Sequence, residues 1–451
     1  MFLRLEKIIF YLFIFCLPLQ IRTIVYQWSV NFNEWISAYI YLSDILILSL
    51  FVFWAFRNRK NRFLKKGFFF KEGSFLKRYD FWLFTFVLIS FISLFKADNF
   101  FLGFYSWLKL LEMVGLFFYI KANYGFIIKV PKMFHALIAA GFLQAVIAIF
   151  QYGGQESIGL RVLRESPLNH ILPGIAKLNL NGFDLIRAYG TMPHPNVLAA
   201  FLAFVLFFIF FVWLNKMKSP CEDSRKSLFI ILEGFLLIAF GLTFSRVAIS
   251  FFVLTFLFYF AIIFLRYIKN KDKIIFKKAA FIFLTTTVFV AIFYFLAWPE
   301  ISARFDISVT EQAITLRNFL KDLSFSVISQ HPIIGLGFGN FVWVLNIKLD
   351  LFYSWVHQPV HNVYLLIAAE TGLLGLTCFL LFVWQLIRSA FWSFRIKHFP
   401  PLLFFTLFSI LVFFFSVGLF DHFLWTLQQG RLMLWLVLGL LAANIYENNS
   451  S

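Results

Sequence analysis

The chain has 451 residues, of which 61% are hydrophobic and only 14% are charged. Long apolar runs recur along its whole length, and about 20 apolar residues allow a helix to cross a bilayer, so this composition excludes a soluble globular protein. The formal charge of +18 does not indicate nucleic acid as a partner, because membrane proteins retain Lys and Arg in their cytoplasmic loops. The three cysteines are too far apart for a metal site or a disulfide framework.

The hydropathy pattern predicts an all-α polytopic membrane protein with about twelve transmembrane helices, which form a single membrane domain over residues 1–451. The N-terminus resembles a signal peptide, but it lacks a small-x-small cleavage site and further spans follow at once, so we expect an uncleaved first helix. The expected spans are residues 8–24, 36–56, 81–96, 103–120, 133–151, 196–215, 228–244, 247–265, 279–297, 362–387, 401–420 and 431–446.

Basic residues are concentrated in alternate loops. Residues 57–78 and 266–278 are the richest in Lys and Arg, and smaller basic sets lie at 121–132, 216–226 and 388–397. The bias of Lys and Arg toward the cytoplasm predicts that these loops and both termini are cytoplasmic. The other side then carries two long loops, 152–195 and 298–361, and the second is expected to be a large extracytoplasmic loop with short helices.

The chemistry is expected on the extracytoplasmic side. Most of the eight histidines fall there, where basic residues are fewer. The cytoplasmic loops contain no GxGxxG turn, P-loop or DxD pair that would hold a nucleotide. A substrate must therefore arrive in the membrane already activated.

The first motif on that side is RAYGTMPHPN, residues 187–196. Arg187 precedes the membrane, His194 lies between two prolines, and Asn196 is expected to cap the following helix. A proline-rich entry turn with an interfacial arginine explains the motif equally well.

The second motif is the Ser245-Arg246 turn, where two spans meet almost without a loop. An arginine at so tight a turn must either reach back to water or bind an anion. The planar guanidinium suits a phosphate or diphosphate, because it binds two oxygens at once.

The third motif lies in the large loop, at residues 314–341. Arg317 begins an amphipathic helical stretch, and His331-Pro332 ends it. Gly335, Gly337 and Gly339 follow as a turn, whose backbone amides are free to approach an anion or another helix. A loop helix on the membrane surface followed by a turn is the structural alternative.

The fourth motif is HQPVHNVYLLIAAETGLLGL, residues 357–376. Imidazole is the side chain best suited to accept a proton near neutral pH, so His361 is a candidate general base. Asn362 is expected to cap the next span, and Gly372 and Gly375 to let that helix pack closely. Glu370 lies at a depth where a carboxylate needs a partner, which could be one of the outer arginines. A weaker cluster, residues 421–431, contains Asp421, His422 and Arg431.

These motifs resemble the O-antigen ligase / polysaccharide polymerase superfamily of bacterial membrane proteins. The resemblance covers residues 185–390 and centres on His-Asn, nine residues, then GxxG at 361–376. It implies a twelve-helix fold and glycan transfer from undecaprenyl diphosphate without a metal or cofactor. It further implies that His361 is the base, that Arg246 and Arg317 bind the diphosphate with help from Arg187, and that Asn362, His194 and Glu370 support the site.

The favoured hypothesis is a glycosyltransferase of the cytoplasmic (inner) membrane that moves the lipid-linked glycan to lipid A-core or another surface acceptor. A polymerase that joins repeat units on the carrier, and a protein O-glycosyltransferase, are alternatives that the sequence does not separate from it. A transporter of the lipid-linked glycan is an alternative of a different class, and it would need polar residues along a membrane path. The main charged residues within the expected spans are few and scattered: Lys109, Glu112, Glu233 and Glu370.

Overall fold

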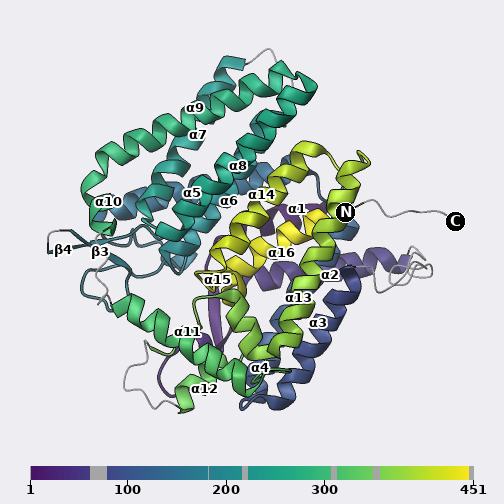
Figure 1. Ribbon diagram of the computed structural model, residues 1–451, viewed down its shortest axis with the longest axis vertical. Coiled ribbons are helices and arrows are strands. Elements are labelled where there is room, and N and C mark those ends of the chain that lie inside the picture. The colour runs from purple at the N-terminus through teal and green to yellow at the C-terminus, as the bar shows by residue number, and fades with distance from the viewer. Residues whose placement is uncertain are drawn as a thin grey trace.

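A computed structural model describes residues 2–60, 79–180, 182–215, 222–305, 312–348 and 356–445. Sixteen α-helices lie in these ranges, and Figure 1 shows them as one bundle of mostly long helices. Seven helices of the described residues are long and apolar enough to cross a membrane. They are α3 (Tyr79–Ser93, continued by a 3-10 turn to Lys96), α4 (Phe100–Asn123), α5 (Val130–Gly154), α6 (Pro195–Asn215), α8 (Arg246–Asn270), α9 (Lys273–Leu296) and α13 (Val363–Arg395). The prediction of a helical, polytopic membrane protein is confirmed in this form.

Each of the other five expected spans also falls on a helix. The total of twelve membrane-spanning helices remains a prediction. These helices are α1 (Phe2–Cys16), α2 (Leu42–Lys60), α7 (Glu222–Leu242), α14 (Pro401–Val417) and α16 (Gln428–Ala443). The last two are apolar but shorter than a typical span. The basic residues predicted for residues 61–78 and 216–221 lie outside the described residues.

The first two predicted spans are wrong where they approach each other. α1 ends at Cys16, before Pro18, and the chain then forms an antiparallel hairpin of β1 (Arg22–Gln27) and β2 (Ser37–Tyr41). Proline removes a backbone donor, which ends the helix. Tyr and Ile favour strands, so the apolar run before α2 was misread as helix. A second hairpin, β3 (Lys177–Leu180) with β4 (Phe183–Ile186), lies in the 152–195 loop, so the all-α prediction needs these two small sheets added.

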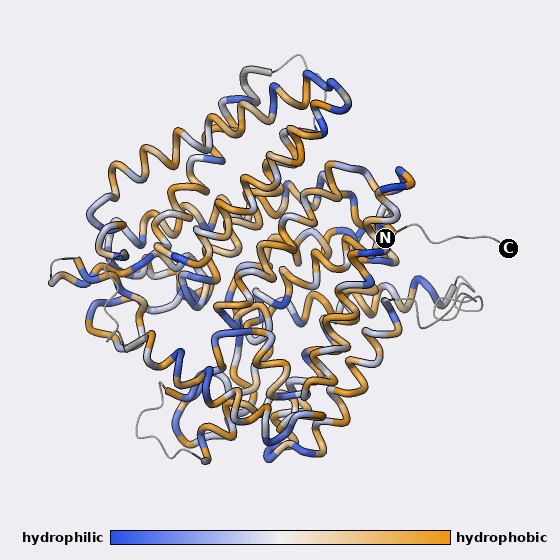
Figure 2. Tube along the Cα trace, viewed as in Figure 1, coloured by the Kyte–Doolittle hydropathy of each residue, from blue (hydrophilic) through white to orange (hydrophobic). Residues whose placement is uncertain are grey.

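The bundle is organised around α6. In its most apolar stretch 89% of the residues are buried, against 17% for α9, so α6 is the central helix and α9 lies at the periphery. α6 packs on α5, α7, α8 and α14, while α13 packs on α3, and α16 on α4. Figure 2 shows that the long helices are largely hydrophobic and that hydrophilic residues gather at the turns and along the loop helices.

The two ends of the helices differ in charge. α8 has 25 residues and is therefore about 37 Å long, enough to cross a hydrocarbon core of about 30 Å. Arg246 begins this helix, whereas the basic turn at Lys271 follows its other end. α13 likewise begins after His361 and ends at Arg395. The predicted site residues thus lie at the ends of α8 and α13 that are remote from the basic turns.

The segment predicted as the large loop contains three helices. They are α10 (Trp298–Phe305), α11 (Gln312–Gln330) and α12 (Phe341–Lys348). In Figure 1 they lie along one side of the bundle together with β3 and β4, and the N-terminus lies on the opposite side. The predicted helix through Arg317 is confirmed, although it begins five residues earlier, and it ends directly before His331 as expected.

Candidate functional site

His361 is held by the cap of α13. The side chain of Asn362 accepts a hydrogen bond from the backbone N–H of Leu365 (2.9 Å), which confirms the predicted cap. Its Nδ2 also donates to the carbonyl of Leu419 (3.0 Å) in the connection after α14. Asn362 therefore ties the start of α13 to a neighbouring turn, and the imidazole beside it has a fixed position.

Gly372 and the glycine-rich turn bring α11 to the same place. Gly372 has φ +71°, a break inside α13, and a Cβ there would lie 2.0 Å from the carbonyl oxygen of Ile333. The break lets the turn bond to α13, from Leu336 N–H to Ala369 O (2.9 Å) and from Leu373 N–H to Pro332 O (2.8 Å). The close-packing role predicted for Gly372 is confirmed, with loop backbone as the neighbour.

The three glycines of the turn also approach other helices and not an anion. A Cβ on Gly335 would lie 2.4 Å from the backbone carbon of Glu370, and one on Gly339 would lie 2.3 Å from Oγ of Ser106. Gly375, the second glycine of the GxxG pair, faces Ile89 of α3. These glycines hold α11, and with it Arg317, against the bundle.

A pair of histidine rings lies directly before α13 and after α14. The ring centroids of His361 and His422 are 5.0 Å apart, and the ring of Trp35 lies 5.0 Å from that of His422. His422 shares a hydrogen bond between its Nδ1 and Oγ1 of Thr426 (2.7 Å). Nδ1 of His361 is buried and makes no hydrogen bond with the described residues. That nitrogen is therefore available to a substrate.

The histidines at this place are neutral at physiological pH. Burial lowers the pKa of His422 to about 3, and the neighbouring His361 acts in the same direction. Burial, and next the charge of Arg187, lower the pKa of His194 to about 3. Burial also lowers the pKa of His361 below its usual value of 6.5, Arg317 adds to the effect, and Asp421 opposes it. An unprotonated imidazole is the form that accepts a proton.

Asn196 connects the second motif to the histidines. Its Oδ1 accepts from Nη2 of Arg187 (2.9 Å) and Oγ of Ser245 (2.9 Å), and its Nδ2 donates to Asp421 (2.8 Å). The prediction that Asn196 caps the helix is wrong, because α6 begins at Pro195 and the Nδ1 of His194 accepts the backbone N–H of Asn196 (3.1 Å). The turn with Pro193 and Pro195 orients the side-chain amide of Asn196 toward Arg187, Ser245 and Asp421, so the amide links these residues.

Asp421 is the negative charge of this network. Burial acts to raise the pKa of its carboxyl, but the neighbouring histidines and the hydrogen bond from Asn196 outweigh burial and lower the pKa to about 2. The backbone N–H of His422 also donates to Asp421 Oδ1 (2.8 Å). The carboxylate thus stays ionised and orients the turn that carries His422.

Four arginines gather around the same network. Arg187 is buried and donates from Nε to the carbonyl of Thr243 (2.6 Å) in the turn between α7 and α8. Burial, and then the positive charges of Arg304, Arg317 and Arg246, lower its pKa to about 9. Arg246 also donates from Nη1 to the carbonyl of Arg304 (3.1 Å). Their four charges exceed that of Asp421, so this part of the described structure attracts anions.

Most of the predicted residues therefore lie within range of one another's charges. The charges of Arg246 and Arg317 act on Arg187, and the charge of Arg317 acts on His194 and on His361. Glu370 does not join them. Its Oε1 accepts from the backbone N–H of Phe341 (3.4 Å), and of the outer arginines it is Arg431 whose charge acts on it. The glycine-rich turn thus supplies a backbone donor beside the outer arginine that was expected.

Sequence reasoning missed Arg304 and gave too little weight to Asp421 and His422. Arg304 lies in α10 without a motif around it, and only its approach to Arg246 reveals it. The sequence did contain a signal for Asp421 and His422: an acidic residue and a histidine stand next to each other between two apolar segments. Among the described residues no cluster of three or more His, Cys, Asp or Glu side chains is arranged to hold a metal ion.

Comparison with known families identifies the region that carries these groups. Residues 231–380 match the O-antigen ligase family, and the matched range includes Arg246, Arg317 and His361. No curated protein matches the chain. The family match agrees with the motifs at 245–246, 317–341 and 361–376, so residues 231–380 are similar to the O-antigen ligase domain that these motifs predict.

Proposed function

We propose that the protein is a glycosyltransferase that moves a glycan from undecaprenyl diphosphate to a surface acceptor such as lipid A-core. The observation that carries the proposal is the buried Nδ1 of His361, unpaired among the described residues, beside a group of arginines. The family match supports the reaction class. A diphosphate and a hydroxyl are the two groups that this combination of side chains suits best.

The reaction needs two activities from these side chains. His361 accepts the proton of the acceptor hydroxyl while that oxygen bonds to the anomeric carbon of the donor sugar. The bond between that carbon and the diphosphate oxygen breaks, and the electron pair leaves with the lipid diphosphate. Arg246, Arg317 and Arg187 stabilise the negative charge that grows on this leaving group. Asn362 positions the base, and His194 supports the turn at Asn196.

The expected location is the outer face of the cytoplasmic membrane, with both termini in the cytoplasm. His361 and Arg246 lie at the ends of α13 and α8 that are remote from the basic turns. Lys and Arg mark cytoplasmic loops, so the site belongs to the opposite side. A glycan that has already been carried across the membrane on its lipid would meet the acceptor there.

Product analysis tests this function. The purified full-length protein is incubated with a labelled polyprenyl-diphosphate-linked glycan and with lipid A-core, a second lipid-linked glycan, or an acceptor protein. We expect labelled lipid A-core. A ladder on the carrier lipid would show a polymerase, and a labelled protein a protein glycosyltransferase. Movement of the donor across a vesicle membrane without a covalent product would contradict the proposal and favour a transporter.

Replacing Arg317 is expected to weaken use of the donor. Arg317→Gln removes one charged hydrogen-bond donor from the diphosphate, which lowers kcat/KM roughly 10- to 100-fold. The matched control is Lys321→Gln, one turn further along α11, which removes the same charge from an exposed position. Steady-state rates at varied donor concentration measure both. Equal losses in the two variants would show that α11 contributes only a general positive field.

The pH profile reports the protonation of His361. Its pKa lies below 6.5, and the base works only when neutral. As the pH falls, kcat/KM is therefore expected to decrease with a midpoint below pH 6.5, where His361 becomes protonated. The measurement is kcat/KM from pH 4.5 to 8 with protein unfolding monitored in parallel. A midpoint above pH 6.5, without unfolding, would exclude a buried neutral imidazole as the base.

A further inference from the structure

A cavity lies next to the site, and none of the residues proposed above as the base or for diphosphate binding lines it. Its volume is about 100 Å³, several times the space that one water molecule requires. The β1–β2 hairpin, α4, the turn before α12 and the start of α16 enclose it. The side chains used below to assign a ligand are Arg22, Tyr39, Tyr41, Lys109, Gln428 and Arg431.

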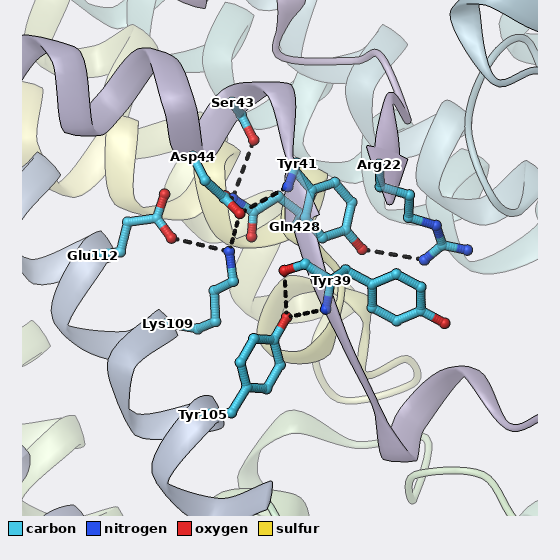
Figure 3. A network of polar contacts seen from close by, with 9 residues as sticks. All are labelled: Arg22, Tyr39, Tyr41, Ser43, Asp44, Tyr105, Lys109, Glu112 and Gln428. Atoms are coloured by element: carbon cyan, nitrogen blue, oxygen red, sulfur yellow. Dashed lines mark hydrogen bonds and ion pairs between the residues drawn. The ribbon is translucent and has the colours of Figure 1, made fainter. Parts of the chain in front are cut away.

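A polar network holds the walls of this cavity, as Figure 3 shows. Lys109 pairs with Asp44 and, at 3.2 Å, with Glu112 on its own helix. Nε2 of Gln428 donates to Asp44 (2.6 Å), so the start of α16 is joined to the start of α2. The hydroxyl of Tyr105 bonds to both the N–H and the carbonyl of Tyr39 (2.9 Å each). The hairpin is thereby fixed over the cavity as a wall.

Several polar side chains line the cavity. Oε1 of Gln428 is buried and has no hydrogen-bond partner among the described residues. Arg431 uses its Nε for the carbonyl of Trp425 (2.5 Å), and its side chain lines the cavity. Arg22 forms an ion pair with Glu34 (2.6 Å) and donates to the hydroxyl of Tyr41 (3.2 Å). Donors and acceptors are therefore both present on the walls.

The charges of the walls distinguish this cavity from the arginine group beside Asp421. Three cations line it, and four carboxylates line it or pair with Lys109: Arg22, Lys109 and Arg431 against Glu34, Glu370, Asp44 and Glu112. A nearly balanced set does not favour a diphosphate, which would need a net positive site. It favours a neutral ligand with many hydroxyl groups, which both donate and accept hydrogen bonds.

The cavity is one side-chain layer away from His361. Trp35 and Thr426 line it, and both contact His422, whose ring lies 5.0 Å from that of His361. Pro359, two residues before His361, lines it as well. A ligand in the cavity therefore lies close to the reacting groups, on the hairpin side of the histidine pair.

We propose that this cavity binds one sugar ring of a glycan substrate. The aromatic side chains Trp35, Tyr39 and Trp425 offer apolar faces to the ring, and the charged groups bond to its hydroxyls. A cavity of this volume cannot hold a polyprenyl chain. That the ring belongs to a glycan being transferred rests on the proposed function, and either the donor or the acceptor could supply it.

The test uses the full-length protein in detergent and saturation-transfer NMR with three free sugars: N-acetylglucosamine, galactose and glucuronic acid. Inorganic diphosphate is the anion probe for a parallel titration. We expect at least one sugar to bind, and Arg22→Gln to weaken that binding about tenfold or more, because a charged hydrogen bond is lost. Gln428→Ala is a second variant, and removal of this side chain does not break an ion pair.

The matched control is Arg57→Gln at the other end of the bundle. Arg57 also pairs with a glutamate, Glu6, at 3.1 Å, and its side chain is 22% exposed, against 19% for Arg22. It does not line the cavity. Sugar binding unchanged in Arg57→Gln and weakened in Arg22→Gln supports the proposal. Binding of diphosphate but of none of the sugars overturns it. Sugar binding that is as strong in both Arg22→Gln and Gln428→Ala as in the unmodified protein overturns it as well.

Kinetics then show whether the donor or the acceptor supplies the sugar ring. If Arg22→Gln raises the KM for the acceptor about tenfold and leaves the KM for the donor unchanged, the ring belongs to the acceptor. If it raises only the KM for the donor, the ring belongs to the donor. His361→Ala should bind the sugar as well as the unmodified protein does. If sugar binding depends on Arg22 but no glycan transfer occurs with any acceptor, the proposed function fails and the sugar site stands. Transfer with unchanged KM values in Arg22→Gln refutes the sugar site alone.

Discussion

His361→Ala is expected to lower kcat/KM for glycan transfer by roughly 100- to 10,000-fold, the usual contribution of a general base. The loss follows because Nδ1 of His361 is buried and has no hydrogen-bond partner among the described residues, whereas Nδ1 of His422 is bonded to Thr426 and Nδ1 of His194 to Asn196. Transfer of labelled glycan from the carrier lipid measures the effect. The reduction should appear in kcat, with KM for the donor nearly unchanged.

The control for this variant is His331→Ala. His331 follows α11 and is exposed, so its removal leaves the histidine pair intact and should change the rate less than about threefold. Thermal unfolding in detergent shows whether each variant is folded. A folded His361→Ala protein with full activity would remove the proposed base, and a His331→Ala loss of equal size would move the chemistry to the loop.

Gly372→Ala is expected to prevent correct assembly of the site. The residue has φ +71° and ψ 176°, a conformation almost exclusive to glycine, which costs another residue about 1–3 kcal/mol. The added Cβ would also lie 2.0 Å from Ile333 O and 2.5 Å from the backbone nitrogen of Ile334, and backbone cannot move aside cheaply. The turn would separate from α13 and take Arg317 away from His361. We expect a large loss of folded protein, measured as the detergent-soluble monodisperse fraction and its thermal midpoint.

Gly125→Ala separates strain from packing. Gly125 also has a positive φ, +76°, but a Cβ there would meet nothing within 4 Å. This variant carries the strain of a positive φ without a backbone clash and should lose only about 1–2 kcal/mol. If both variants lose the same stability, the contact between the glycine-rich turn and α13 does not hold the site together.

The local signals in the sequence were read correctly where neighbouring residues decide the outcome. Asn362 caps α13 because an asparagine before an apolar helix satisfies a free backbone N–H. α11 ends at His331 because proline follows it. The two hairpins were not foreseen, since a short apolar run of Tyr, Ile and Ala is compatible with helix and strand alike.

Contacts between distant segments were beyond the sequence. Arg304 has no motif of its own, and its place beside Arg246 depends on how α10 folds back on α8. The backbone partner of Glu370 was not foreseen, because the approach of the glycine-rich turn to α13 supplies an N–H that no spacing in the chain indicates. The cavity under the hairpin combines residues from Arg22 to Trp435, which only the packed bundle brings together.

The sequence by itself determined that this is a helical membrane protein with a region similar to the O-antigen ligase family, because hydropathy, charge bias and the His-Asn/GxxG spacing are properties of short segments. Tertiary structure alone decided that Arg304 and Asp421 join the predicted histidine and arginines, and that Glu370 belongs to a separate cavity. The physical reason is that charge and burial act through space. Residues far apart in the chain change one another's protonation and partners only after the helices have packed.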